Sequence, residues 1–518
     1  MQIYSFSPFG YEGSLVSVEV DIRRGIPAID MVGLADGAVK ESRERMKAAI
    51  RNSGYDFPPE RVLISLSPAD LKKEGAGFDL AVALGVLCAS SKDQGQTEAG
   101  LGPDVLVLGE LELSGALRPV RAVHAAASSA RAAGIGYCVV PAANANEARE
   151  AAGMKVFGAK NLREAFEALC DKSLFTDAKK PGGPDFVPKD CVEVDGVLFP
   201  PVYGENGFDD LRGQKDLVRA CSIAAAGGHN LLAFGPPGCG KSLILQRFPA
   251  LLPLLTAEEA QSATRIHSIA GLMPPGQGLL RIPPFRQPHM SSSLEGMCGG
   301  GAQCRPGEIS LAHNGALFLD EAAEFRSSVL QMLRVPLESQ KIVLSRAGRT
   351  AVYPASFQLL MAANPCPCGN YGSEKKVCLC SARSIELYWK KFSAPLLDRV
   401  DLRVKVDIPD QESDFDSPPF STSELRLGVA RAVKAQRARQ ACKNARLSPE
   451  KTDEICELSA EASKLLLKAA RRFDFSPRAL ASCKKIARTV ADMAGSQKIS
   501  GEHMAEAVDL RKTTGILS

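Results

Sequence analysis

The stretch Gly235-Pro-Pro-Gly-Cys-Gly-Lys-Ser242 constrains this chain more than any other. It fits the pattern G-x-x-x-x-G-K-[ST], in which glycines let the backbone wrap around phosphate oxygens. An apolar run over 230–234 precedes it, and a helix-like run over 242–248 follows it. This order suits a phosphate-binding loop, because the free N–H groups of a helix start attract an anion. The residues expected around the phosphates are Gly235, Pro236, Pro237, Gly238, Cys239, Gly240, Lys241 and Ser242.

A second motif supplies two carboxylates. Residues 315–321 read Gly-Ala-Leu-Phe-Leu-Asp-Glu, which is the pattern of a buried strand that ends in Asp320 and Glu321. We expect Ser242 and Asp320 to hold Mg²⁺, Lys241 to reach the β- and γ-phosphates, and Glu321 to orient the attacking water. Taken alone, such a strand equally suits a surface acidic pair. Downstream of a phosphate loop, it predicts an ATPase with ATP and Mg²⁺ as cofactors.

Length and composition set wider bounds. A chain of 518 residues is too long for one ordinary core, so two to four domains are expected. A net charge of +4 neither demands nor excludes a nucleic-acid partner. The N-terminus has no basic region followed by an apolar core, and glycines and charges interrupt the longest apolar runs. The sequence therefore predicts a cytoplasmic protein without a membrane span, in which the 15 cysteines are reduced or bind metal.

Changes in composition along the chain suggest its organisation. The first part alternates strand-like and helix-like segments, and a stretch rich in Lys, Pro, Gly and Asp then reads as a linker. An α/β nucleotide-binding unit follows, with an irregular insertion over 270–308, and the chain ends in helices with caps at Ser459 and Ser500. The four expected ranges are 1–172, 173–198, 199–408 and 409–518.

Three further stretches resemble elements of AAA+ ATPases. A strand that ends at Asn364 resembles sensor 1, and the Asn side chain would help position the lytic water. The stretch Pro-Leu-Leu-Asp-Arg-Val-Asp over 395–401 resembles the segment with the arginine finger, so Arg399 would stabilise charge on a neighbour's γ-phosphate. Ser-Pro-Arg478, at a helix start, resembles sensor 2. The alternatives are a strand-end turn for Asn364, a local ion pair for Arg399 and a solvated side chain for Arg478.

The whole chain closely resembles the YifB/ComM family of magnesium-chelatase-like AAA+ proteins. The stretches that carry the resemblance are 286–289, 305–313, 317–321, 364–369, 395–399 and 487–492. One departure is Met290, because a second His would normally follow His289. The resemblance implies a homo-hexameric ring that acts on single-stranded or branched DNA, with branch migration or helicase activity in homologous recombination during natural transformation. The alternative is a magnesium-chelatase-type remodeller that uses ATP to act on a partner protein.

The N-terminal part resembles a Lon-type protease. Residues 73–78 resemble the loop before the serine nucleophile, and residues 109–120 resemble the strands that lead to the dyad lysine. In this register, the serine position falls on Gly77 and the lysine position on His124. A glycine carries no nucleophile, so the resemblance implies an α+β protease-like fold without peptidase activity. The implied architecture adds a central AAA+ domain with a parallel sheet and a helical lid.

Four cysteines occur in one short stretch, in two C-x-C pairs. Four thiolates suit tetrahedral Zn²⁺, although C-x-x-C pairs are more common, and reduced thiols are the alternative. Cys298 and Cys304 form a second candidate pair. The four expected zinc ligands are Cys366, Cys368, Cys378 and Cys380.

A DNA motor needs basic groups that face the phosphate backbone. Residues 341–352 read as a hairpin with basic residues near its tip, and this is the first candidate for DNA contact. The insertion, with Arg281, Arg286 and Arg305, and the basic run over 421–446 come next. For all three, a solvated face or pairing between subunits is the alternative. The hairpin residues expected to contact DNA are Lys341, Arg346 and Arg349.

Overall fold

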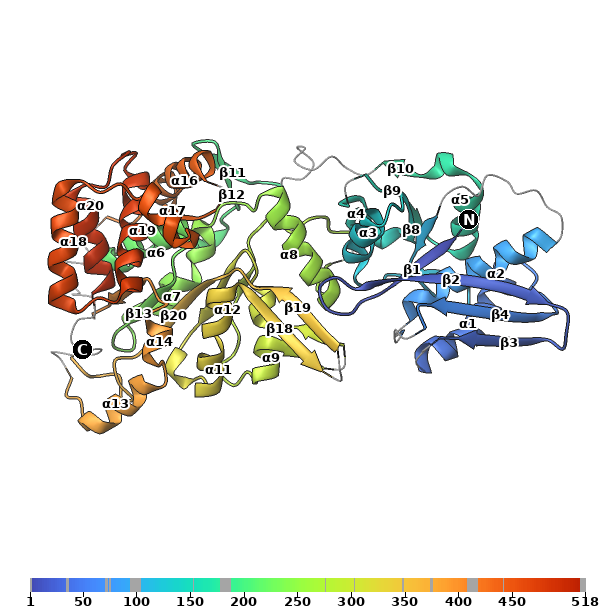
Figure 1. Ribbon diagram of the computed structural model, residues 1–518, viewed down its shortest axis with the longest axis horizontal. Coiled ribbons are helices and arrows are strands. Elements are labelled where there is room, and N and C mark those ends of the chain that lie inside the picture. Colours follow the sequence, from blue (N-terminus) through green and yellow to red (C-terminus); the bar gives the residue numbers. More distant parts are fainter. Residues whose placement is uncertain are drawn as a thin grey trace.

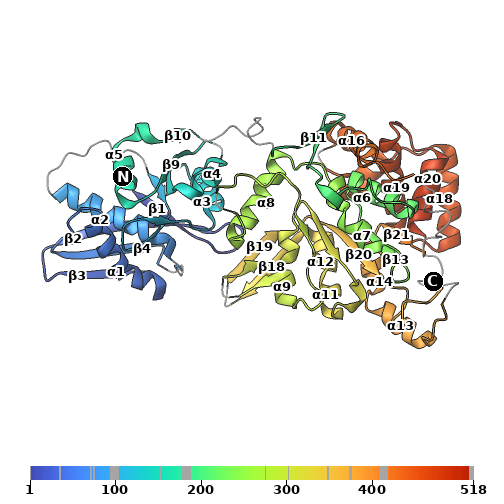
Figure 2. The same ribbon diagram turned by 180° about the vertical axis from the view of Figure 1, so that it is seen from behind.

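The computed structural model is elongated, with an N-terminal lobe at one end, the phosphate-loop unit in the middle and a helical lid at the other end (Figure 1). Figure 2 shows the same three parts from behind. The residues that the structure describes are 2–33, 37–69, 73, 76–93, 104–151, 153–177, 188–274, 276–301, 303–346, 349–372, 376–407, 418–440 and 442–512.

The N-terminal lobe is built on an eight-stranded mixed sheet with the order β10-β9-β8-β5-β1-β2-β4-β3. Side chains alternate between its two faces: Val105 and Val107 pack with α2, whereas Leu106 packs with α3. The strands are β1 (Ile3–Ser7), β2 (Ser14–Arg23), β3 (Ala28–Val32), β4 (Arg61–Ser67), β5 (Val105–Val107), β8 (Tyr137–Pro141), β9 (Lys155–Ala159) and β10 (Thr176–Asp177), beside the hairpin of β6 (Glu110–Leu111) and β7 (Leu117–Arg118). The helices are α1 (Gly37–Asn52), α2 (Asp79–Asp93), α3 (Val123–Ala132), α4 (Ala145–Arg149) and α5 (Leu162–Cys170).

The stretch read as a linker contains regular structure at both of its described ends. The strand β10 pairs with β9 of the N-terminal sheet, and β11 (Val192–Val194) pairs with β12 (Val197–Phe199). Residues 178–187, between these strands, lie outside the described residues. The predicted domain boundaries stay a prediction.

The middle of the molecule is a five-stranded parallel sheet with the order β14-β17-β20-β13-β21. Its inner strands are fully buried, which explains why they read as continuous apolar runs. Its strands are β14 (Phe285–Arg286), β17 (Ala316–Leu319), β20 (Gln358–Ala363), β13 (Leu231–Phe234) and β21 (Leu402–Lys405). The predicted α/β class with a central parallel sheet is confirmed.

Helices cover both faces of this sheet. On one face, α6 (Lys215–Gly227) joins the lid in a single hydrophobic core, and on the other face α11 and α13 pack with β17 and β20. The remaining elements of this unit are α7 (Lys241–Gln246), α8 (Ala257–Ala270), α9 (Leu294–Cys298), β15 (Gly299–Gly300), β16 (Arg305–Pro306), α10 (Glu308–Leu311), α11 (Ser327–Met332), α12 (Arg334–Ser339), β18 (Lys341–Arg346), β19 (Arg349–Pro354), α13 (Ala382–Lys390) and α14 (Ala394–Leu397).

The lid consists of helices, as predicted. Ser459 and Ser500 cap α18 and α20, and each side-chain oxygen accepts a hydrogen bond from a backbone N–H of the first turn. No helix in the described part of the chain is long and apolar enough to cross a membrane. The lid helices are α16 (Thr422–Arg439), α17 (Pro449–Ile455), α18 (Ala460–Phe473), α19 (Pro477–Met493) and α20 (Gly501–Arg511).

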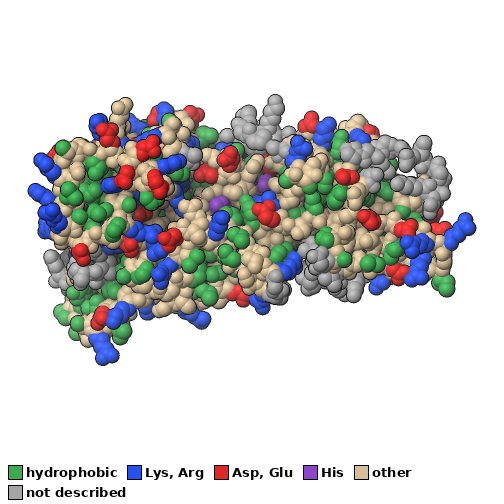
Figure 3. Space-filling view, viewed as in Figure 1, with side chains coloured by type: hydrophobic (Ala, Val, Ile, Leu, Met, Phe, Trp, Pro, Cys, Tyr) green, Lys and Arg blue, Asp and Glu red, His purple; other side chains and the backbone are tan. Residues whose placement is uncertain are grey.

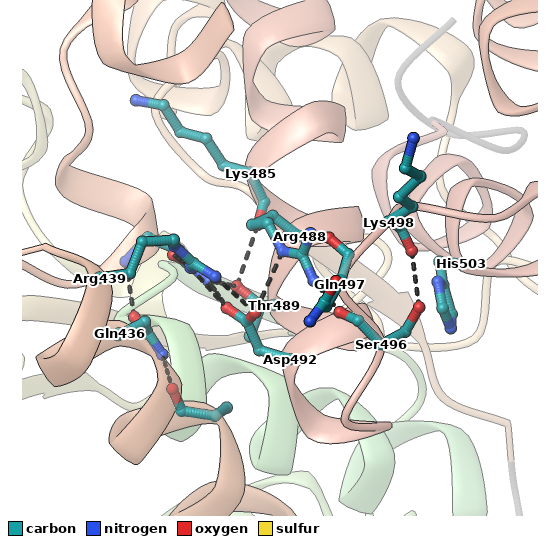
Figure 4. A network of polar contacts seen from close by, with 12 residues as sticks. Gln436, Arg439, Lys485, Arg488, Thr489, Asp492, Ser496, Gln497, Lys498 and His503 are labelled. Carbon is teal, nitrogen blue, oxygen red and sulfur yellow. Dashed lines mark hydrogen bonds and ion pairs between the residues drawn. The ribbon is translucent and has the colours of Figure 1, made fainter. Parts of the chain in front are cut away.

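A buried ionic network fixes α19 to the rest of the lid (Figure 4). Arg439 of α16 and Arg488 of α19 both pair with Asp492, at 2.8 and 3.1 Å. Next to this network, Thr489 Oγ1 lies 2.8 Å from Nε2 of the buried His229, two residues before β13. The helix is therefore anchored both within the lid and to the sheet.

Two of the segments that join the N-terminal lobe to the middle unit are the turn between β1 and β2 and the helix α8. The turn between β1 and β2 reaches toward the β18–β19 hairpin, and α8 packs against α3 (Figures 1 and 2). Arg265 of α8 donates to the Tyr11 carbonyl at 2.8 Å and pairs with Glu12 at 3.0 Å. A Cβ added at Gly10 would lie 2.8 Å from the Ala351 Cβ, so the turn approaches the hairpin closely at a glycine with φ +63°.

Candidate nucleotide site

The predicted phosphate loop connects β13 to α7 at the C-terminal edge of the parallel sheet. A Cβ at Gly235 would lie 1.9 Å from the Val406 carbonyl oxygen, so only glycine fits between the two chain segments. Gly240 has φ +86° and caps α7, which begins at Lys241. The Lys241 Nζ donates to the carbonyls of Gly235 and Pro236, both at 2.7 Å. The ammonium group is thus held inside the loop.

The carboxylates of the second motif lie directly opposite this loop. The strand β17 runs parallel to β20, which in turn runs parallel to β13, so their C-terminal ends meet at one edge. Ser242 Oγ donates to Asp320 Oδ1 at 2.7 Å. A hydroxyl and a carboxylate in this position are the oxygen ligands that Mg²⁺ takes in phosphate sites. The donor set therefore fits the metal that the sequence predicts.

Glu321 adopts an unusual backbone conformation beside Asp320. Its φ of +47° lies in the left-handed region, and its N–H donates to Asp320 Oδ1 at 3.0 Å. A non-glycine residue in this region stores roughly 1–3 kcal/mol of strain, and such residues concentrate at functional sites. The side chain of Glu321 is exposed at the rim of the cavity.

A cavity of about 370 Å³ joins these groups. Asn364, which follows β20, lines it together with the two motifs, so the structure brings the predicted sensor-1 residue to the phosphate loop. The lining residues that carry chemistry are Lys241, Ser242, Asp320, Glu321 and Asn364.

The two predicted arginines lie elsewhere, at the N-terminal edge of the same sheet. Arg399 precedes β21, and its carbonyl accepts a hydrogen bond from Asn230 at the start of β13. A strand rises about 3.3 Å per residue, so the five residues from Asn230 to Gly235 separate the two edges by roughly 16 Å. Arg478 lies beside Arg399 and lines the same cavity of about 580 Å³. Neither arginine lines the cavity around the phosphate loop.

The lid holds the segment around Arg399 from two sides. From α19, Ser482 Oγ donates to Asp401 at 2.6 Å. From α20, the buried Arg511 donates to the Asp398 carbonyl at 2.9 Å and also to the Val400 carbonyl. Ser476, the cap of α19, donates to the Asp398 carboxylate at 3.1 Å. Arg399 and Arg478 are therefore fixed together by the contacts between the lid and the sheet.

A carboxylate that sequence reasoning missed lies between the two arginines. Glu338 of α12 pairs with Arg399 Nη2 and lies 3.6 Å from Arg478 Nη1. The helix that carries Glu338 is six residues long and matches no motif, so no local signal distinguished this residue from other exposed acids.

Comparison with known proteins decides the family. Residues 18–144 match the family model of subunit ChlI of Mg-chelatase, residues 207–413 that of magnesium chelatase, subunit ChlI, and residues 420–511 its C-terminal model. Competence protein ComM of Haemophilus influenzae is 35% identical over 529 residues, which cover 99% of this chain and 98% of that protein. The chain belongs to the YifB/ComM family. YifB of Escherichia coli is 36% identical over 518 residues, which cover 99% of this chain and 97% of that protein.

This YifB/ComM protein is thus an AAA+ ATPase of the magnesium-chelatase-like type, and its family suggests ATP and Mg²⁺ as cofactors. The pairwise sequence similarity to a single magnesium-chelatase subunit covers a smaller share of this chain. The 38 kDa magnesium-chelatase subunit of Acidiphilium rubrum is 29% identical over 184 residues, only 30% of this chain.

The four cysteines of the YifB/ComM chain meet in the loop after β20. Their sulfur atoms all lie within 4.8 Å of one another, and three of the separations are 3.4, 3.6 and 3.7 Å. Hydrogen bonds lower the pKa of the Cys368 thiol, and the bond from the backbone N–H of Asn370 has the largest effect. The spacing of the four sulfur atoms fits a tetrahedral metal site. In the described part of the chain, Cys298 and Cys304 belong to no comparable cluster.

The cysteine loop also touches the phosphate loop. A Cβ at Gly369 would lie 2.7 Å from Pro237 Cδ, and Trp389 Nε1 donates to the Pro365 carbonyl at 3.0 Å. The loop therefore packs against the wall of the nucleotide cavity.

The basic residues offered as DNA contacts differ in their surroundings. The hairpin forms as predicted, and Arg346 lies opposite Arg349 in the register of its two strands. Arg346 is exposed and lies 3.5 Å from Glu295, whereas the Arg349 guanidinium stacks 3.7 Å from the centre of the Phe9 ring. On the face shown in Figure 3, basic side chains are interspersed with acidic ones.

Several of the other basic candidates take part in internal contacts. Arg286 forms a two-pronged pair with Glu308, at 2.7 and 2.8 Å. In the basic run over 421–446, the buried Arg426 donates to the carbonyls of Ala250 and Pro200, and Arg446 donates to that of Phe357. These two guanidinium groups satisfy donors on backbone carbonyls inside the protein, whereas Arg431, Lys434 and Arg437 of the same run are exposed, so the run stays a candidate for DNA contact.

The two dyad positions of the N-terminal lobe carry no nucleophile and no lysine. Gly77 lies in a short 3-10 turn before α2. His124 is 2% exposed, and neither ring nitrogen has a hydrogen-bond partner among the residues that the structure describes. Burial lowers the pKa of His124 to about 4, so its imidazole is neutral near pH 7. The predicted lack of peptidase activity stays a prediction.

Proposed function

We propose that this AAA+ ATPase hydrolyses ATP at sites shared between adjoining protomers of a hexameric ring, and that hydrolysis drives branch migration or unwinding of DNA. The observation that supports the shared site is the separation of its two halves. The phosphate loop and the carboxylates lie at one edge of the sheet, whereas Arg399 and Arg478 lie at the other. In a ring, the arginine edge of one protomer would face the phosphate loop of the next.

Each group then has a distinct role. The N–H groups of the loop and Lys241 would bind the β- and γ-phosphates, and Ser242 and Asp320 would hold a Mg²⁺ ion, which would neutralise phosphate charge. Glu321 polarises the attacking water, and Asn364 keeps that water in line. Arg399 of the neighbouring protomer stabilises the charge that develops on the γ-phosphate, and Arg478 contacts the same phosphate. All of these groups except the two arginines line one cavity of one protomer.

We propose that DNA is the molecule on which the motor acts, and that the protein works in the cytoplasm. Its support is the full-length likeness to a competence protein, together with an exposed hairpin that carries Arg346 at its tip. A chelatase-type remodeller is less well supported, because the 38 kDa magnesium-chelatase subunit of Acidiphilium rubrum matches only 30% of this chain, whereas ComM matches 99% of it. During natural transformation, such a motor would extend recombination joints.

The cysteine loop would bind one Zn²⁺ through Cys366, Cys368, Cys378 and Cys380. Support comes from the distances among the four sulfur atoms. A closed four-thiolate site has no open position for catalysis, so the ion would stiffen the loop that packs on Pro237.

ATP turnover of the wild-type protein tests the proposal under four conditions: without DNA, and with single-stranded DNA, duplex DNA or a four-way junction. We expect the junction to raise turnover the most. If none of the three forms of DNA changes the rate of ATP turnover, the proposed DNA motor is contradicted. If there is no turnover under any of the four conditions, the ATPase site is contradicted.

A further inference from the structure

Glu338 occupies a position between two cations that would otherwise repel each other. Its Oε2 accepts a hydrogen bond from Arg399 Nη2, and its Oε1 lies 3.6 Å from Arg478 Nη1. The hydrogen bond from Arg399 keeps the pKa of Glu338 below its usual range, so the carboxylate is charged at neutral pH. One negative charge between two guanidinium groups offsets their mutual repulsion.

The other contacts of the Arg399 side chain fix the direction in which it points, but they do not fix its position relative to Arg478. Arg399 Nη1 donates to the Pro395 carbonyl at 2.7 Å, and its buried Nε has no partner among the described residues. The Arg399 side chain is 13% exposed, whereas Glu338 is 61% exposed. The carboxylate therefore covers the end of Arg399 from the solvent side, at the wall of the cavity that Arg478 shares.

We propose that Glu338 is a positioning residue that holds Arg399 and Arg478 side by side and presents them as a unit to the nucleotide of the adjoining protomer. This inference rests on the proposed function, because it needs the two arginines to act between protomers. An exposed ion pair contributes little to folding. A phosphate, like a carboxylate, accepts two N–H bonds from one guanidinium group, and it carries more charge, so both arginines can pass from Glu338 to the γ-phosphate.

The direct test is Glu338→Gln, which keeps the size of the side chain and removes its charge. We expect kcat of the assembled protein to fall about tenfold to a hundredfold, because misplacing a reacting group by about 1 Å costs about 10²-fold. KM for ATP should stay within about twofold, since Glu338 does not line the cavity around the phosphate loop. The matched control is Glu386→Gln, another exposed glutamate in an ion pair, which should keep wild-type kcat. An unchanged kcat in Glu338→Gln would overturn the inference.

A double-mutant cycle separates positioning from general damage. If Glu338 works through the arginines, Glu338→Gln should cause a much smaller loss in an Arg478→Gln background than in the wild type. Losses that multiply independently would overturn the inference. Glu338→Asp, which keeps the charge on a shorter side chain, should retain part of kcat, and a loss as large as that of Glu338→Gln would count against the role.

Mixed rings show from which protomer Glu338 acts. Mixing Glu338→Gln with Lys241→Ala protomers should restore turnover, because the Lys241→Ala protomer supplies an intact arginine edge to its neighbour; no recovery would overturn the inference. Arg399→Ala, measured in parallel, separates the two failures. If Arg399→Ala loses turnover while Glu338→Gln keeps it, the positioning role falls and the proposed function stands. If Arg399→Ala keeps full turnover, the proposed function falls, and the inference falls with it.

Discussion

The two edges of the parallel sheet differ in how they are built. At the C-terminal edge, one contiguous loop and two strand ends supply the groups around the nucleotide cavity, and the parallel register of β13, β17 and β20 brings them together. At the N-terminal edge, Arg399, Arg478 and Glu338 come from three separate segments: Arg478 belongs to the lid, the lid holds the segment of Arg399, and Glu338 of α12 pairs with both arginines. The first edge is preformed by local sequence, whereas the second depends on tertiary contacts. If the proposed function is right, neither edge works without the other.

The largest effect should come from the C-terminal edge. Lys241→Ala removes the ammonium that neutralises the β- and γ-phosphates, so we expect no detectable ATP turnover. Turnover and binding of a fluorescent ATP analogue are the measurements. Normal turnover in a folded variant would refute the assignment of the loop.

The N-terminal edge should show a different kinetic signature. Arg399→Ala should lower kcat by about 10³-fold or more, because an arginine finger contributes about 10³–10⁵-fold. Binding of ATP to the same protomer should change little, since Arg399 does not line that cavity. Equilibrium binding and steady-state kinetics on one preparation give both values. Weakened ATP binding with an unchanged kcat would show that the two edges do not divide the work in this way.

A smaller effect should come from the cysteine loop that supports the C-terminal edge. Cys366→Ser should remove about one zinc ion per chain, lower the melting temperature by roughly 5–10 °C and raise KM for ATP, because the loop packs on Pro237. Atomic absorption and thermal unfolding measure the first two quantities. Cys298→Ser is the control and should change none of the three. Protein that is free of zinc in both variants and in the wild type would contradict the metal site.

The smallest effect should come from the hairpin. Arg346→Ala combined with Arg349→Ala should weaken DNA binding and lower the slope of log affinity against log salt by roughly 1–2, since each phosphate contact contributes about 0.7–0.9. Lys498→Ala, which removes an exposed, paired lysine from the lid, should leave the slope unchanged. Fluorescence anisotropy at several salt concentrations gives these slopes. If the slope of the double variant equals that of the wild type, the DNA contacts a surface other than the hairpin.

The sequence predicted the C-terminal edge well, because its information is local. The order of strand, glycine loop and helix is written within twenty residues, and an apolar strand followed by Asp320 and Glu321 needs no distant partner to be recognised. The strands, the hairpin and the caps at Ser459 and Ser500 follow from periodicity and capping chemistry in the same way.

What the sequence did not predict depends on contacts between distant segments. Glu338 meets Arg399 from 61 residues away, and Arg349 meets Phe9 of the N-terminal lobe, where no local pattern marks either contact. The buried Arg426 looked like a surface charge, because sequence does not show which arginines will bind backbone carbonyls inside the fold. Long-range ion pairs and stacking are set by packing, so they escape patterns of spacing.

Turnover of mixed rings tests the central claim most directly. Lys241→Ala protomers lack the phosphate-binding ammonium but keep the arginine edge, whereas Arg399→Ala protomers have the opposite defect. We predict that each variant alone is inactive and that mixtures regain ATP turnover, with a maximum at intermediate ratios. Mixtures that remain inactive at every ratio, although both variants are shown to assemble together, would contradict a site shared between protomers.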